Sequence, residues 1–410
     1  MTMDAIAHPA TRGAARAVGV AAVLTLFTAI AFGFGLYLFA LLSAVMRDSL
    51  RFDYGAIGFA TGGAQVAYLI AALVCPALTA RFGAGQVIVS AVATSGALLL
   101  CFSGIRHIEE GAALLAGLGA AAACMMVPTV GATSKCVPFA YRSRVNGLVS
   151  SGTAYGQLAS GLFVAWIVPS HGWRSIWLVA GAASLALVPA GYLSLRFIAP
   201  EVFVRDRPQK IARPGVPVLA ETLVTRRHMT VWALLAISGM ACGPWQNYLS
   251  SYLTGERGQS PADLGQLWSI IGMVGLFSGL MAGSIADRLG IRVGLAASWL
   301  TLAMSSIMIA LAPDLGMLRL AAACFGLSFY AVYGLIPAYI SKTVDARTGN
   351  RVFSIANVSL GVGTAFGNVI GGHLSSWFGS LQGVFMLASV LACVGAALTV
   401  SLADERQILA

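Results

Sequence analysis

Charged residues are scarce in this chain. Only 10% of its 410 residues are charged, whereas 58% are hydrophobic. A soluble protein of this size carries about 25% charged residues, and it needs polar groups to cover its surface. The composition therefore excludes an ordinary soluble globular protein and indicates a chain whose solvent is the lipid bilayer.

The sequence also lacks the patterns that would indicate an enzyme or a metal protein. Its seven cysteines are scattered, odd in number and mostly inside apolar runs, where a thiol behaves as a small hydrophobic group. It has no P-loop, no HExxH motif and no Gly-x-Ser-x-Gly elbow. We therefore expect no catalytic residue, no cofactor and no metal, and the chain is not expected to be an enzyme.

The net charge of +10 does not point to nucleic acid, because the basic residues are scattered over the ends of apolar runs. If the N-terminus is cytoplasmic, most Lys and Arg fall in cytoplasmic segments. The outer loops then hold only Arg47, Arg51, Arg106, Arg174, Arg257 and Arg319. Because cytoplasmic loops of membrane proteins are rich in Lys and Arg, we predict that both termini are cytoplasmic.

Twelve apolar runs are long enough to cross a bilayer core of about 30 Å, which needs roughly 20 helical residues. They lie near 18–46, 56–80, 86–105, 111–134, 145–169, 174–197, 229–254, 261–284, 291–312, 316–340, 352–376 and 382–403. A charged stretch separates the sixth from the seventh. The sequence thus predicts an all-α membrane protein with one six-helix bundle at 1–198, a cytoplasmic linker at 199–227 and a second six-helix bundle at 228–410.

The two halves of the chain resemble one another. Thr153-Ala-Tyr-Gly156 recurs as Thr364-Ala-Phe-Gly367. The same or nearly the same spacing pairs Gln157 with Asn368, Gly161 with Gly372, Gly58 with Gly265, Arg81 with Arg288 and Gly83 with Gly290. Matches at nearly constant spacing indicate a duplicated six-helix unit, and in transporters built this way the substrate site lies between the repeats.

One loop in the second half carries a family resemblance. It reads Gly283-Ser-Ile-Ala-Asp287-Arg288-Leu-Gly290-Ile-Arg292 and resembles the G-x-x-x-D-R-x-G-x-R loop of the major facilitator superfamily. With the repeat, the resemblance covers nearly the whole chain. It implies two pseudo-symmetric six-helix bundles and a secondary transporter of a bacterial inner membrane that works by alternating access.

The resemblance implies that this loop is a conformational latch formed by Gly283, Asp287, Arg288, Gly290 and Arg292. The alternative is that the two arginines only anchor the loop on the cytoplasmic side. The first-half copy, Ala80-Arg81-Phe-Gly83-Ala-Gly85, has no acid at the position equivalent to Asp287. A latch in the first half is therefore not predicted from the motif.

Polar residues inside the runs predict the solute site, because an unsatisfied polar group in lipid costs several kcal/mol. They avoid runs 3, 6, 9 and 12, apart from Gln86 at an end, and these four helices lie outside in the family's fold. The residues expected to line a cavity are Tyr37, Gln65, Tyr68, Gln157, Trp245, Asn247, Tyr330, Tyr333, Asn357 and Asn368. Two alternatives remain: the tyrosines can serve helix packing, and Gln157 and Asn368 can form a polar clasp between helices.

No Asp, Glu, Lys or Arg lies deep inside a run, and Lys135 and Lys342 lie at run ends. The first interpretation is proton-linked uptake of a neutral or weakly acidic metabolite, with the proton bound elsewhere. The second is an uncoupled facilitator, and the third has the two lysines hold an anion near the inner gate. Export of hydrophobic or amphipathic compounds is a further alternative. The expected partners are a small solute, protons and the bilayer, with no nucleic acid, and we expect a monomer.

Overall fold

The computed structural model describes residues 9–205, 225–311, 314–344 and 346–402, so most of the predicted linker lies outside the described residues. Every regular element in the described part is a helix. The first group comprises α1 (Pro9–Thr28), the π-helix η1 (Ala29–Tyr37), α2 (Leu38–Leu50), α3 (Tyr54–Phe82), α4 (Ala84–Phe102), α5 (Ile108–Cys136), α6 (Phe139–Ile198) and the short 3-10 helix η2 (Pro200–Phe203). The second group comprises α8 (Arg226–Gly255), α9 (Pro261–Leu289), α10 (Ile291–Leu311), α11 (Leu315–Thr343), α12 (Ala346–Phe378) and α13 (Gln382–Val400).

The described helices account for the predicted passes through the bilayer. Among the residues that the structure describes, ten helical stretches are long and apolar enough to span the bilayer. One of them, 144–198, reverses at Gly172, where φ is 73°, a backbone conformation that favours glycine. This stretch therefore passes through the bilayer twice. Helix α8 has 30 residues, about 45 Å, and is long enough to cross although it is more polar than those ten. The prediction of an all-α membrane protein is confirmed.

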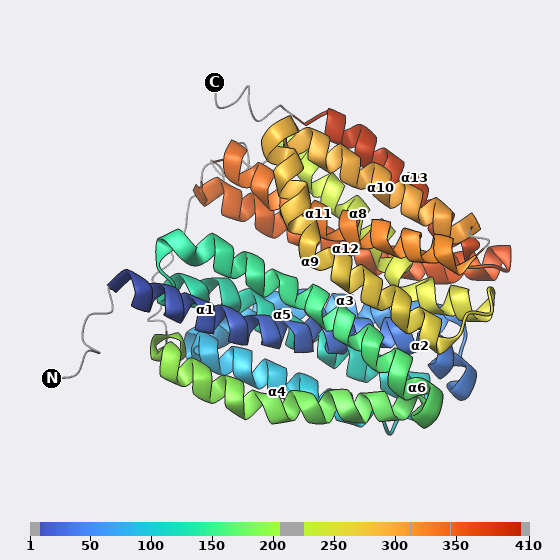
Figure 1. The fold of residues 1–410 in the computed structure, drawn as a ribbon, viewed down its shortest axis with the longest axis horizontal. Coiled ribbons are helices and arrows are strands. Elements are labelled where there is room, and N and C mark those ends of the chain that lie inside the picture. The colour runs from blue at the N-terminus through green and yellow to red at the C-terminus, as the bar shows by residue number, and fades with distance from the viewer. Residues whose placement is uncertain (1–8, 206–224, 312–313, 345, 403–410) are drawn as a thin grey trace.

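The two groups of helices lie side by side (Figure 1). The start of α1, on the left of the figure, and the end of α13, at its top, lie at one end of the molecule, which we call the terminal end. The opposite end, which carries the turns at Arg51, Gly172 and Glu256, is the far end. Across the two groups, α3 packs on α12, α6 on α9 and α2 on α8.

Repeat-related glycines lie where the two groups touch. A Cβ atom added to Gly161 of α6 would lie 2.5 Å from the carbonyl oxygen of Gly265 on α9. A Cβ on Gly58 of α3 would lie 2.5 Å from the carbonyl oxygen of Asn368 on α12, and one on Gly372 would lie 3.1 Å from Cα of Gly55. Only glycine permits this approach, so the spacing found in the sequence marks the contact between the groups.

The contact between α6 and α9 runs from the far end only as far as mid-depth. Gly265, Gly272 and Gly279 share one face of α9, because seven residues make two helical turns. The first two pack against α6: a Cβ atom added to Gly272 would lie 2.5 Å from the backbone nitrogen of Leu158. A Cβ atom added to Gly279 would meet nothing within 4 Å. On α6, Gly147 is equally open. The two helices therefore diverge toward the terminal end.

Helices α3 and α12 diverge in the same direction. Their contact runs from Gly58 to Leu69, which approaches Gly361. Beyond it, Leu73 on α3 is 77% exposed, and Asn357 on α12 is also exposed. The two groups are thus closed against each other at the far end and apart at the terminal end.

Candidate functional site

Four tyrosines from both groups gather near the middle of their helices. Tyr37 ends η1, Tyr68 lies on α3, and Tyr330 and Tyr333 lie on α11. All four are partly buried, and the Tyr37 hydroxyl is close enough to the other three for electrostatic interaction. We call them the tyrosine cluster. The structure therefore brings together four of the residues predicted to line a cavity.

Aromatic rings extend the tyrosine cluster. The ring of Phe329 lies 4.9 Å from that of Tyr330 and 4.8 Å from that of Tyr333, between ring centroids. The Tyr37 ring lies 6.2 Å from Trp268 of α9. Such rings present flat apolar faces, and the tyrosines add hydroxyl groups at their edges, which suits a pocket of mixed character.

The π-helix η1 places Tyr37 in the cluster and was not predicted from the sequence. Within it, Gly33 lies so close to α6 that a Cβ atom would come 2.2 Å from Cα of Gly156. The Ser160 hydroxyl donates a hydrogen bond to the Gly33 carbonyl at 3.2 Å. Turns of π-helix are often found at functional sites. The signal in the sequence is the pair Gly33 and Gly35 inside a continuous apolar run.

Gln157 joins the tyrosine cluster from α6. Its side chain is fully buried, and its Oε1 accepts a hydrogen bond from the Tyr330 hydroxyl at 2.8 Å. Its Nε2 has no hydrogen-bond partner among the described residues. This bond joins the first group of helices to the second at mid-depth.

Asn368, the repeat counterpart of Gln157, lies in the contact between α3, α8 and α12. It is 1% exposed, and its Oδ1 accepts a hydrogen bond from Asn247 Nδ2 at 3.0 Å. Its backbone carbonyl accepts one from the Tyr248 hydroxyl at 2.8 Å. The same hydroxyl lies 3.4 Å from the carbonyl oxygen of Tyr54. Asn247 and Asn368 are therefore brought together, within the closed contact at the far end.

The remaining predicted cavity residues lie in three different settings. Gln65 lies at the contact of α3 with α12, with Nε2 2.9 Å from the Cβ position of Gly361. Trp245 is fully buried inside the second group, stacked on Phe325 with 3.7 Å between ring centroids. Asn357 is exposed toward the terminal end and donates a hydrogen bond to its own helix.

The predicted latch residues lie at the terminal end. Gly290 ends α9 with φ 98°, and its repeat counterpart Gly83 ends α3 with φ 87°, so both positions require glycine. Asp287 is 3.6 Å from Lys342 of α11, an exposed ion pair that is weak by itself. Arg292 donates to the last carbonyl of α13, at Val400. These contacts tie the end of α9 to α11 and the start of α10 to α13. A Cβ atom added to Gly283, in the last turns of α9, would meet nothing within 4 Å.

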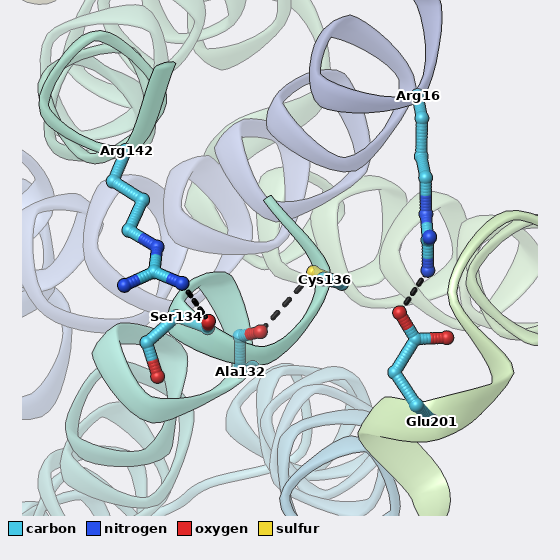
Figure 2. A network of polar contacts seen from close by, with 6 residues as sticks. All are labelled: Arg16, Ala132, Ser134, Cys136, Arg142 and Glu201. Atoms are coloured by element: carbon cyan, nitrogen blue, oxygen red, sulfur yellow. Dashed lines mark hydrogen bonds and ion pairs between the residues drawn. The ribbon is translucent and has the colours of Figure 1, made fainter. Parts of the chain in front are cut away.

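The first group has a different arrangement at the same end (Figure 2). Arg16 of α1 pairs with Glu201 of η2, and Arg142 of α6 donates to the Ser134 carbonyl of α5. The ring of Phe203 fills the space over Gly85, where a Cβ would lie 2.8 Å from it. The loop of the first half lacks the acid of the motif. In this half the acid is instead Glu201, from the segment after α6, which pairs with Arg16 near the start of α1.

Two surface grooves lie away from the tyrosine cluster. One lies between α6 and α9 and is lined by Leu162, Ala165, Trp166, Ala262, Gln266, Ser269 and Ile270. The other lies between α3, α5 and α12, and its lining includes Phe59, Val369 and His373. Neither groove includes a residue of the tyrosine cluster. We take the cluster with Gln157 as the candidate solute site because it joins polar side chains of both groups at mid-depth.

Comparison with known proteins identifies the architecture. A family model described as Major Facilitator Superfamily matches residues 23–360. Two solved structures align over nearly the whole chain: an inward-facing bacterial homologue of the human lysosomal transporter Spinster (14% identity, TM-score 0.72, 98% of both chains), and the nucleoside transporter NupG (13% identity, TM-score 0.72, 93% of this chain and 99% of that chain). At these identities they show a shared fold.

Three curated relatives match parts of the sequence. The cis,cis-muconate transport protein of Acinetobacter baylyi is 26% identical over 230 residues, 52% of either chain. The gallate transporter of Pseudomonas putida is 29% identical over 35% of this chain and 33% of its own. Human monocarboxylate transporter 11 is 32% identical over 38% of this chain and 32% of its own. The chain thus spans about half the length, or less, of these relatives.

Proposed function

Because this chain belongs to the major facilitator superfamily, it is a multi-pass membrane transporter and not an enzyme, and we propose that it takes up a small organic acid together with a proton. Transport would proceed by alternating access, in which the far end and the terminal end open in turn. We further propose that 1–198 and 228–410 are the two moving bundles, that 199–227 links them, and that the protein acts as a monomer.

The observation that carries the proposal is the tyrosine cluster with Gln157 at mid-depth between the two groups. Hydroxyl and amide groups suit a solute with hydrogen-bonding oxygens, and the rings suit a flat carbon skeleton. The relatives named above as transporters of muconate, gallate and monocarboxylates support a carboxylic acid as the solute. Uptake is favoured over drug export because the Gly-Pro pair common in antiporters of this family is missing from Gly152–Gly161.

Uptake of labelled acids into proteoliposomes tests the proposal. With benzoate, gallate and cis,cis-muconate as probes, we expect at least one to accumulate when the outside is made more acidic than the inside. Adding a protonophore should abolish accumulation above equilibrium. Equilibration that ignores the protonophore would instead identify an uncoupled facilitator. Failure of all three acids, combined with export of amphipathic dyes, would favour the efflux alternative.

We propose that the protein lies in a bacterial inner membrane with its terminal end in the cytoplasm, which makes the present conformation inward-facing. The excess of Lys and Arg at that end supports this orientation. We expect a reporter that is active in the cytoplasm to be active when it is fused within 206–224. A reporter that is active only outside the cytoplasm should be inactive there. Fusions at Gly258, in a far-end turn, should show the opposite pattern. Alkaline phosphatase activity from the 206–224 fusions would overturn the orientation.

Lys135 and Lys342 are both exposed at the terminal end. Under this orientation they would lie at the cytoplasmic opening, where a positive charge can attract an anion. Because Lys342 lies beside Asp287, its charge is partly offset. The two lysines are therefore proposed as a weak guide for the acid and not as its binding site.

A further inference from the structure

We propose that the repeat-related amides have divided roles: Gln157 binds a carboxylate oxygen of the solute, whereas Asn368 closes the far end. This inference rests on the proposed function and names the residue that recognises the acid. It also names the solute class, a planar unsaturated carboxylate.

Only one of the two polar atoms of the Gln157 side-chain amide has a hydrogen-bond partner among the described residues. Its Oε1 is occupied by the Tyr330 hydroxyl, and its Nε2, in a fully buried side chain, lacks a partner among the described residues. A buried N–H without an acceptor is unfavourable, and binding an oxygen atom there removes the penalty. Because the bond to Tyr330 fixes the amide with its oxygen toward α11, the group left for a solute is a donor. Donors bind carboxylate oxygens.

The helix geometry directs Gln157 toward the tyrosine cluster. Gly156 packs on η1 at one side, and Leu158 packs on α9 at the other. Gln157 therefore points between these helices, toward α11. Space for Tyr330 is provided by Gly275 of α9, where a Cβ atom would come within 2.3 Å of the tyrosine ring. Helix α9 thus provides the room in which the Tyr330 and Gln157 side chains meet.

The neighbouring rings define the shape of the solute. The rings of Phe329 and Tyr330 pack edge to face, and the Phe329 ring also packs against that of Tyr333. A flat conjugated skeleton can lie against these rings while its carboxylate reaches Nε2 of Gln157. A branched or bulky saturated acid gains less contact from the same surface.

Asn368 has an equivalent amide in different surroundings. Its Oδ1 is also occupied, by Asn247, and its Nδ2 has no partner among the described residues. However, it is packed against α3 and α8: Gly58 lies against its carbonyl, and a Cβ on Gly243 would be 3.3 Å from its Oδ1. Asn368 therefore acts in the helix contact, and it is the matched control for Gln157.

The test measures KM and maximal rate separately, with benzoate, gallate and cis,cis-muconate as probes in proteoliposomes. Gln157→Leu is expected to raise KM at least about tenfold, the effect of losing one hydrogen bond to a charged oxygen, with a smaller change in maximal rate. Gln157→Glu keeps an acceptor for Tyr330 and removes the N–H, so it should raise KM at least as much. Asn368→Leu is expected to lower the maximal rate and leave KM within about twofold.

Thermal unfolding in detergent checks that each variant folds. If Gln157→Leu does not fold, Gln157→Glu provides the same test. An unchanged KM in a folded Gln157 variant would overturn the inference while leaving the proposed function intact. An equal rise in KM for Asn368→Leu would overturn the division of roles. Absence of acid uptake by the unmodified protein would instead overturn the proposed function.

Discussion

The double variant Ser43→Cys/Ser251→Cys is expected to stop transporting when it is oxidised and to recover when it is reduced. Ser43 of α2 and Ser251 of α8 are both fully buried, and their hydroxyl oxygens are 3.1 Å apart. They belong to different groups of helices and are 208 residues apart in the sequence. Cysteines at such a separation are candidates for a disulfide of about 2 Å S–S length. That bond would keep the far end closed.

Alternating access requires these two serines to separate once in every cycle. We therefore expect the oxidised protein to transport no faster than empty vesicles and the reduced protein to approach the unmodified rate. Ser43→Cys and Ser251→Cys alone are the controls, because they test for pairing with any of the seven natural cysteines. A cross-linked protein, verified by mass spectrometry, that still transports at the rate of the single variants would show that the far end does not open.

Alanine at Gly161 or Gly265 is expected to have the opposite structural effect. A Cβ on Gly161 would lie 2.5 Å from the Gly265 carbonyl oxygen, and a Cβ on Gly265 would lie 2.5 Å from the Gly161 carbonyl oxygen. These obstacles are backbone atoms, so α6 and α9 must move apart. Alanine favours the helix by about 1 kcal/mol relative to glycine, so folding is not expected to suffer.

The consequence is a smaller population of the far-end-closed state. A shift of about 1.4 kcal/mol lowers that population relative to the open state tenfold, and we expect uptake to fall at least about tenfold. Gly63→Ala is the matched control, since a Cβ there would meet nothing within 4 Å. Uptake by Gly161→Ala equal to that of Gly63→Ala would contradict a close-packed far end in the transport cycle.

The sequence was sufficient to predict the helices and to reveal glycines that recur in both halves. Gly58, Gly161, Gly265 and Gly372 stood out because they recur at nearly constant spacing, and the structure adds that all four lie in contacts between the groups. The polar residues also fell on helices near the centre, since lipid penalises them elsewhere. These features depend on residue type and spacing, which a sequence displays directly.

The rotation of each helix and its partners could not be predicted in the same way. Trp245 and Tyr330 both lie at mid-depth, yet Trp245 packs inside its own group and Tyr330 reaches across to Gln157. Both are aromatic residues in apolar runs, so the sequence does not distinguish them. The pairing of Arg16 with Glu201 was also missed, because it joins residues 185 positions apart without any shared motif.

Counterflow with the double-cysteine protein tests alternating access at this site most directly. Proteoliposomes are loaded with the unlabelled acid that gave uptake, and a trace of the same acid, labelled, is added outside without any gradient of pH. The reduced protein is predicted to accumulate label transiently above equilibrium, and the oxidised protein is predicted to accumulate none. Label that rises smoothly to equilibrium without an overshoot in the reduced protein, or an overshoot that persists after cross-linking, would contradict the account.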